Sequence, residues 1–156
     1  MRALLLLGPD RNAVSGISTH LNQLMDSRLA RQYRMSHFQV GSEGRAEGRL
    51  GKLRRMLFSP WQLAWVLLRE RPAIVHINSA MDPKAFWRDL VYLMVARVLG
   101  RRIVYQIHGG QLPDAFTRGS AAFAWLVRAV CRIPDRFVLI ARIEDQAWRR
   151  FMPSLR

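Results

Sequence analysis

Residues 73–107, AIVHINSAMDPKAFWRDLVYLMVARVLGRRIVYQI, contain two short apolar runs on either side of a longer stretch with a helical pattern. The first run ends at Asn78, and Asp82 with Pro83 then supplies the start signals of a helix. Gly100 is a stop signal, and the second apolar run begins soon after it. A strand, a helix and a strand at this spacing predict two parallel strands joined by a crossover helix.

The same alternation continues toward both ends of the chain. Residues 3–7 form an apolar run that ends at a Gly-Pro turn, which is typical of a strand buried on both faces. Further expected elements are a helix with the stripe Ile17, Leu21, Leu24, Met25 and Leu29, a strand at 34–40, a mobile polar loop at 41–51, a helix at 52–69 that breaks or restarts at Ser59–Pro60, a helix within 118–133, a strand at 135–141 and a helix from 143. We predict the α/β class: a Rossmann-like, doubly wound parallel sheet with helices on both faces, as one domain over residues 1–156.

Composition limits the partners. A chain of 156 residues, half of them hydrophobic, suffices for one core. Its 25 Lys and Arg against 11 Asp and Glu give a formal net charge of +14, and all but Lys52 and Lys84 are arginine. This excess suits nucleic acid, a phosphate-bearing ligand or an acidic membrane surface, and it is also typical of a bias in genomic base composition. Because no basic helix-turn-helix, zinc or aromatic RNA-binding signature occurs, we expect no nucleic-acid partner.

The sequence favours the cytoplasm. Cys131 is the only cysteine, which excludes an internal disulfide and a cysteine-clustered zinc site. The opening MRALLLLGPDR lacks the small-residue cleavage site of a signal peptide. The longest uncharged stretch, 56–68, is shorter than the roughly 20 apolar residues of a spanning helix. We expect a cytoplasmic protein, with peripheral contact to the inner face of the cytoplasmic membrane as an open alternative.

Loops at the carboxyl ends of the expected strands hold most of the unusual polar residues, and ligands bind there in sheets of this class. Ser15 and Gly16 precede a helix whose free N–H groups favour a phosphate or carboxylate. The alternative is that Ser15 only caps the helix and Gly16 allows close packing. Neither G-x-G-x-x-G nor G-x-x-x-x-G-K-[ST] occurs, which disfavours classical nicotinamide binding and P-loop chemistry.

Two further loops carry candidate residues. Asn78 and Ser79 follow the third expected strand and are placed to contact a ligand, whereas His76, within that strand, fits a satisfied core histidine. His108 ends the fourth strand, where it suits a hydrogen bond to a sugar hydroxyl or phosphate, or proton transfer near neutral pH. Gly109 and Gly110 then allow positive φ and close approach of a ligand, or else form a tight turn beside an incidental histidine. No two histidines have metal-ligand spacing, so we predict no metal site.

Four segments, taken in order, resemble the amino-terminal domain of retaining glycosyltransferases of family 4, which have the GT-B fold. SGISTHLNQL (15–24) is similar to that family's glycine loop and first helix, and RPAIVHINSAMDP (71–83) to its P-D-V-V-H-x-H-S strand. RRIVYQIHGG (101–110) is similar to its T-x-H-G strand, and DRFVLIARIEDQAW (135–148) to its fifth strand and the helix after it. The resemblance covers nearly the whole chain.

The resemblance implies a role for each candidate residue. His108 would be the catalytic residue at the donor sugar; Ser15, Gly16, Gly109 and Gly110 would lie beside the nucleotide-sugar donor; Asn78, Ser79 and Asp82 would face a lipid-linked or polysaccharide acceptor. We expect no cofactor and no metal on this chain. A carboxyl-terminal domain or separate subunit is expected to carry the nucleotide site, so the isolated chain is expected to be inactive.

Residues 49–71 combine basic and apolar side chains, among them Arg54, Arg55 and Trp61. A cationic amphipathic segment with tryptophan suits an anionic membrane surface or a lipid-linked acceptor. The alternative is that its apolar face packs on the sheet and its arginines are solvated. The leading hypothesis is therefore an acceptor-binding glycosyltransferase domain, and the second is a non-catalytic, membrane-associated half of a split glycosyltransferase that recruits a nucleotide-binding subunit.

Overall fold

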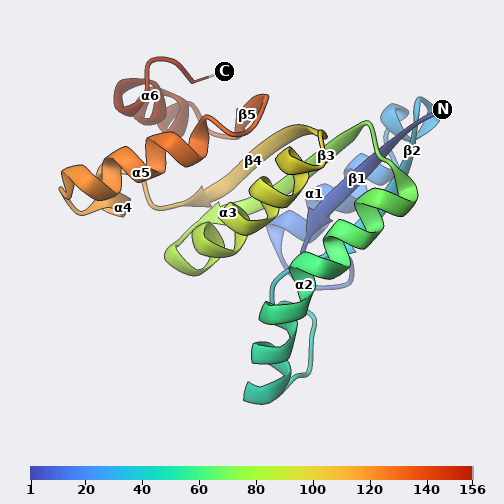
Figure 1. Ribbon diagram of the computed structural model, residues 1–156. Helices are drawn as coiled ribbons and strands as arrows, with labels where there is room; N and C mark the ends of the chain where they lie inside the picture. Colours follow the sequence, from blue (N-terminus) through green and yellow to red (C-terminus); the bar gives the residue numbers. More distant parts are fainter. Residues whose placement is uncertain (156) are drawn as a thin grey trace.

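The computed structural model, which describes residues 1–155, contains a five-stranded sheet whose strands are all parallel (Figure 1). The strands are β1 (Arg2–Gly8), β2 (Tyr33–Gln39), β3 (Ile74–Met81), β4 (Arg102–Gly110) and β5 (Arg136–Leu139), in the order β2-β1-β3-β4-β5. The helices are α1 (Gly16–Met25), a 3-10 turn (Arg28–Arg31), α2 (Arg49–Glu70), α3 (Pro83–Val98), α4 (Pro113–Thr117), α5 (Ala121–Cys131) and α6 (Arg142–Phe151). The predicted α/β class with a Rossmann-like, doubly wound sheet is confirmed.

Alternate residues of β1 face two different cores, because successive side chains of a strand point to opposite faces. Leu4 and Leu6 pack with Leu21 of α1. Leu5 and Leu7 belong to the larger core on the other face, which α2, α3, α5 and α6 cover with side chains that include Leu63, Leu67, Phe86, Leu93, Val127 and Trp148. A continuous apolar run is therefore what this central strand requires.

The strand order places a topological switch point between β1 and β3. From β1 the chain goes to β2 on one side, and from β2 it crosses back to β3 on the other side. Leu4–Leu7 of β1 pair with Ile74–Ile77 of β3 in register. Because the connections diverge here, the carboxyl ends of β1 and β3 leave a crevice of the kind in which ligands bind.

Asp82 and Gly100 delimit α3 as expected. The Asp82 carboxylate accepts hydrogen bonds from the backbone N–H groups of Lys84 and Ala85, at 2.9 and 3.0 Å. Gly100 follows the helix with φ +68°, a conformation that favours glycine. The first helix is shorter than its apolar stripe suggested, because Ser27 caps a separate 3-10 turn that leaves Leu29 exposed.

The predicted break of the second helix at Ser59–Pro60 is wrong: α2 is continuous from Arg49 to Glu70 with Pro60 inside it. Ser59 does not cap a helix. Its Oγ instead accepts a hydrogen bond from the Tyr92 hydroxyl of α3 at 2.8 Å. A proline inside a helix costs about 3 kcal/mol, and the burial of Leu63 and Leu67 against α3 and the sheet opposes that cost.

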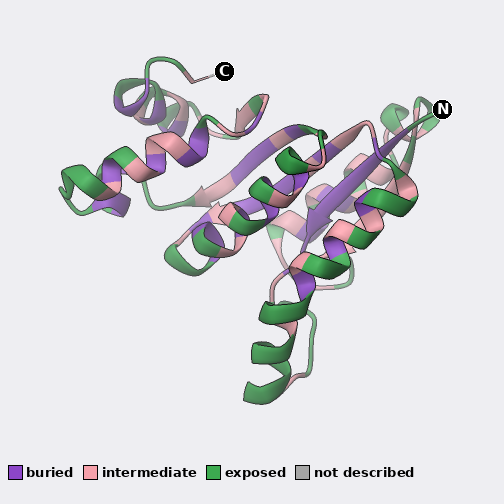
Figure 2. Ribbon diagram, viewed as in Figure 1, coloured by how far each residue is buried: buried purple, intermediate pink, exposed green. Residues whose placement is uncertain are grey.

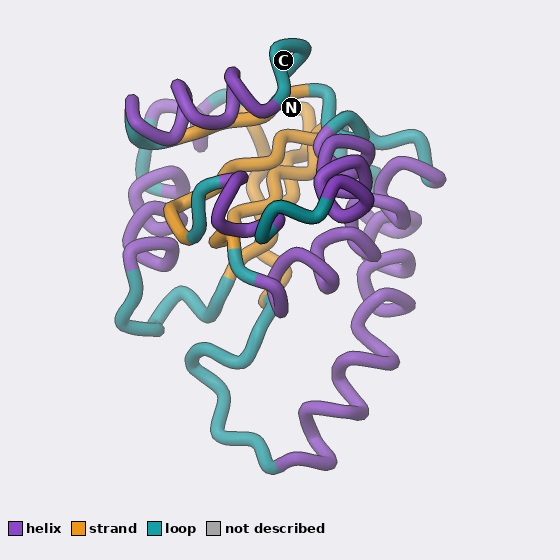
Figure 3. Tube along the Cα trace, turned by 90° about the vertical axis from the view of Figure 1, so that its left-hand side faces the viewer, coloured by secondary structure: helices purple, strands orange, loops and turns teal. Residues whose placement is uncertain are grey.

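The first half of α2 extends beyond the rest of the molecule together with the loop before it (Figures 1 and 3). The buried residues of α2 are Ser59, Leu63 and Leu67, all in its second half. Every residue of the projecting turns from Arg49 to Phe58 is exposed except Arg55, which is half-buried (Figure 2). Within residues 1–155, no helix has both the length and the apolar character needed to cross a membrane.

We predict that Gly110→Ala destabilises the fold strongly, whereas Gly109→Ala does so mildly. Both glycines have positive φ, +110° and +94°. A Cβ on Gly110 would lie 2.5 Å from the carbonyl oxygen of Met81, whereas one on Gly109 would first meet Glu144 Oε1 at 3.8 Å. We expect losses of about 3–5 and about 1–2 kcal/mol in the free energy of unfolding, measured by urea denaturation. Equal losses would contradict this account.

Candidate functional site

A small cavity lies at the switch point, and we call it the switch-point pocket. It has a volume of about 110 Å³ and is lined by the carboxyl ends of β1, β2 and β3 and by the first turns of α1 and α3. Asn78, Ser79 and Asp82, the predicted acceptor residues, all line it. All three come from the end of β3 and the cap of α3. Parallel pairing brings them beside Pro9 and Val40, which follow β1 and β2, because the carboxyl ends of parallel strands share one edge of the sheet.

Asn78 connects this pocket to His108. The amide nitrogen of Asn78 donates hydrogen bonds to the carbonyl oxygens of Leu7 and His76, at 3.3 and 3.4 Å. Its Oδ1 therefore faces His108 Nε2, 3.0 Å away. Because an amide oxygen only accepts hydrogen bonds, Nε2 must carry the proton, which leaves Nδ1 as the unprotonated nitrogen of the neutral ring. Nδ1 has no hydrogen-bond partner among residues 1–155.

Three histidines gather on the α1 side of the sheet. The rings of His20 and His108 meet edge to face with centroids 4.7 Å apart, and His76 Nε2 lies 3.0 Å from Gln106 Oε1. Burial, together with a smaller effect of the neighbouring His20, lowers the pKa of His76 and of His108 to about 4. His76 is thus the satisfied histidine expected from its place in the strand, and His108 is a neutral imidazole at physiological pH.

Ser15 is used as a helix cap. Its Oγ accepts a hydrogen bond from the backbone N–H of Ser18 at 3.2 Å and lies 3.0 Å from Ser18 Oγ, which donates to the carbonyl of Asp10 at 2.7 Å. A Cβ on Gly16 would meet nothing within 4 Å, so packing does not require glycine there. The space beside the first turn of α1 is open to a ligand.

The two glycines after His108 have a structural explanation. β4 continues through Gly110, which pairs with Met81 of β3, and the N–H of Gln111 donates to the Met81 carbonyl at 2.8 Å. The main chains approach so closely at Gly110 that a side chain would overlap Met81. Gly109 has more room, and its predicted contact with a donor stays a prediction.

Sequence reasoning missed Arg88, which also lines the switch-point pocket. Its Nε donates to Asp89 Oδ1 at 2.8 Å, and Nη2 donates to Ser79 Oγ at 3.2 Å. The side chain of Asp89 is 1% exposed and accepts a further hydrogen bond, of 3.1 Å, from the Tyr105 hydroxyl. Burial raises the pKa of Asp89, which the charge of Arg88 opposes. The available signal was a pair of adjacent opposite charges within the apolar middle of the helix.

A separate groove of about 750 Å³ runs along α2, and we call it the α2 groove. Arg54, Arg55 and Trp61, the predicted membrane or acceptor residues, all line it, together with Phe38, Phe58 and Trp65. Arg55 donates to Glu47 Oε1 through Nε and Nη2, at 2.9 and 2.6 Å, and to Ser42 Oγ at 3.0 Å. Ser42 also lines the switch-point pocket. The hydrogen bonds of Arg55 therefore fix the loop that connects the α2 groove to that pocket.

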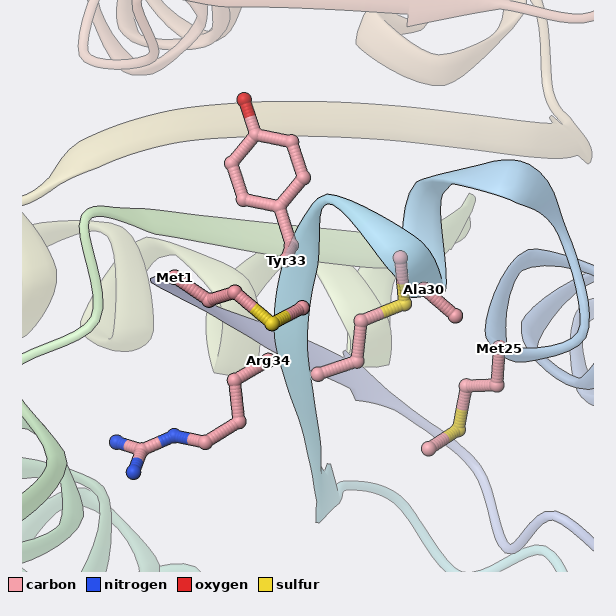
Figure 4. A pocket seen from close by; sticks show the side chains of 6 residues that line it. Met1, Met25, Ala30, Tyr33 and Arg34 are labelled. Carbon is pink, nitrogen blue, oxygen red and sulfur yellow. The ribbon is translucent and has the colours of Figure 1, made fainter.

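A third pocket lies at the opposite end of the sheet, where β2 begins. Its volume is about 520 Å³, and Met1, Met25, Ala30, Tyr33, Arg34 and Met35 line it (Figure 4). It contains none of the candidate site residues. Flexible methionines at an edge strand fill irregular space, and we do not assign this pocket a function.

The sequence matches neither a protein family nor a curated protein. No protein-family model matches the sequence, and no curated protein sequence matches it at a significant level. The residues that the structure describes include no group of three or more His, Cys, Asp or Glu side chains able to hold a metal ion. The resemblance to family 4 glycosyltransferases therefore stays a prediction.

We predict that acidification destabilises the fold between pH 6.5 and about pH 4. In that range the unfolded chain binds protons near the ordinary histidine pKa of 6.5, whereas folded His76 and His108, with pKa values of about 4, remain neutral. The free energy of unfolding must then fall as the pH falls. Urea denaturation across this range should show the loss, and His76→Gln should reduce it. A flat profile would contradict the buried, neutral state of these histidines.

Proposed function

We propose that this chain is the acceptor-binding half of a glycosyltransferase that moves a sugar from a nucleotide-sugar donor to a lipid-linked or glycan acceptor. The observation that carries the proposal is the neutral His108, fixed by Asn78 with its Nδ1 unpaired, next to a polar pocket at the switch point. A lone pair in this position accepts a hydrogen bond from a sugar hydroxyl, which a protonated imidazole does not do.

The nucleotide part of the donor needs more room than this pocket provides. Ligand sites usually occupy about 300–1,000 Å³, whereas the switch-point pocket measures about 110 Å³. We infer that a further domain or a separate subunit closes over the carboxyl edge of the sheet and completes the donor site. Ser15 and Gly16 lie at the start of α1, and Gly109 and Gly110 end β4. All four are at or near that edge and would then lie beside the donor.

The test of His108 uses the complete enzyme, reconstituted with its nucleotide-binding part. We expect His108→Ala to lower kcat/KM for sugar transfer by about 10²-fold or more, because the transition state loses its hydrogen-bond acceptor. His108→Gln, whose Oε1 can accept the same hydrogen bond, should retain more activity than the alanine variant. Transfer that is unchanged in His108→Ala would refute this role.

The exposed surface of α2 favours a second candidate, a membrane-associated half that recruits a nucleotide-binding subunit. Large apolar side chains are exposed on the projecting part of the helix and just after it: Leu50, Leu53, Met56, Leu57, Phe58, Trp61 and Trp65, with Leu50 at 83% and Trp61 at 75%. Arg49, Lys52 and Arg54 are exposed among them. Near an anionic lipid surface each basic residue contributes about 1 kcal/mol, and the tryptophans suit the headgroup region.

We expect the chain to sediment with vesicles rich in phosphatidylglycerol and much less with pure phosphatidylcholine. Trp61→Ser should weaken this binding several-fold, because an exposed ring at the interface is lost. Trp125→Ser is the matched control, since Trp125 is 68% exposed but lies on α5. An equal effect of both substitutions, or no preference for anionic vesicles, would count against the membrane surface.

A further inference from the structure

The guanidinium group of Arg88 divides its hydrogen-bonding edges between the protein and the switch-point pocket. Nε and Nη2 are occupied by Asp89 and Ser79. Nη1 has no acceptor among residues 1–155 and lies 3.1 Å from the position of a Cβ on Gly41, another lining residue. The side chain remains 26% exposed. One edge of the group is thus fixed by a buried carboxylate while the other is available to a ligand.

The charges around this edge do not favour an anion. Asp89 is fully buried directly behind Arg88, so the pair contributes little net charge to the pocket. The other charged residues of the lining are Asp82 and Glu43, both acidic. A phosphate in the pocket would meet two carboxylates and a guanidinium that is already neutralised, and like charges at short range disfavour binding.

The same groups match a neutral hydroxyl group well. Asp82 uses Oδ1 to cap α3, whereas Oδ2 has no hydrogen-bond partner in the described part of the chain. A hydroxyl accepts one hydrogen bond and donates another, and the lining offers it both a donor, Arg88 Nη1, and acidic acceptor oxygens. Neighbouring hydroxyl groups on a sugar ring offer this pattern twice.

We propose that the switch-point pocket is a subsite for vicinal hydroxyl groups of a neutral sugar or polyol, that Arg88 is its specificity-determining donor, and that it excludes phosphate. The inference deepens the proposed function and rests on it only for the role of the bound sugar as acceptor. The hydroxyl preference itself follows from the lining charges. Arginine is required because a lysine ammonium has no fixed fork with which to contact Asp89 and a ligand together.

The experiment follows backbone amide resonances of Ser42, Ser79 and Ala85 in the 156-residue chain by NMR. The probes are methyl glucoside, methyl mannoside and myo-inositol as neutral polyols, and inorganic phosphate as the anion. We expect at least one polyol to shift these resonances in a saturable manner and phosphate to leave them unchanged. Phosphate binding at these amides, or no response to any polyol, would overturn the proposal.

Two substitutions locate the binding to this pocket. Arg88→Lys should weaken polyol binding about tenfold or more, with Arg132→Lys on the exposed end of α5 as its control. Asp82→Ser keeps a good helix cap and should also weaken polyol binding. Its control is Asp114→Ser, at an exposed position. If the pocket bound phosphate, removal of the Asp82 carboxylate would strengthen that binding instead. Thermal unfolding of each variant shows whether the fold is retained, and unchanged polyol affinity in folded Arg88→Lys would overturn the role of Arg88.

This result is separate from the test of sugar transfer. Polyol binding at the pocket together with an inactive complete enzyme would retain the subsite and reject the proposed function. Phosphate binding together with normal transfer would reject the subsite and retain the proposed function.

Discussion

The buried side-chain amide of Asn78 connects the three strands from which the candidate site is built. It donates to the main chain of β1 at Leu7 and to its own strand at His76, and it accepts from His108 on β4. The first of these bonds crosses the switch point, where the sheet would otherwise hold β1 and β3 together only by their ladder. One side chain thus contacts the carbonyl groups of Leu7 and His76 and the imidazole of His108. Because strand pairing fixes the two carbonyl groups, it also fixes the amide and, through it, the orientation of the imidazole.

Two polar clusters lie near this amide on opposite faces of the sheet: the histidines, and the pair Arg88 and Asp89. They avoid the energetic cost of burying a charge in different ways. The histidines on the α1 side remain neutral, so that no charge has to be desolvated. Arg88 and Asp89, beside the larger core, remain an ion pair with hydrogen bonds from Tyr105 and to Ser79. A buried ion pair contributes little to stability, but removal of one partner leaves an unpaired buried charge at a high cost in free energy. Arg88 is therefore held in place by Asp89.

Sequence patterns were sufficient for the elements that depend on local chemistry. Apolar runs located β1, β3, β4 and β5, and Asp82 and Gly100 delimited α3 because capping and left-handed φ are properties of single residues. Pro60 misled because tertiary contacts of Leu63 and Leu67 outweigh its local effect. The reason for Gly110 was also inaccessible, since it depends on the approach of Met81, a residue 29 positions earlier. The candidate acceptor residues were found because the third apolar run ends near them, although β3 extends to Met81, so that Asn78 and Ser79 lie within the strand and are buried. Arg88 lies within a helix, and only its pairing with Asp89 marked it.

Folding and contact with a partner usually constrain the same residues of a protein. In the projecting part of α2, the constraint from folding is almost absent. Its turns from Arg49 to Phe58 contribute no buried side chain to the core, and ten residues of helix extend about 15 Å. Most substitutions there therefore leave the free energy of folding nearly unchanged, apart from small differences in helix propensity. If related sequences keep the same side chains in the projecting part of α2, selection for contact with a partner is the reason. Elsewhere in the chain, selection for folding also restricts the side chains.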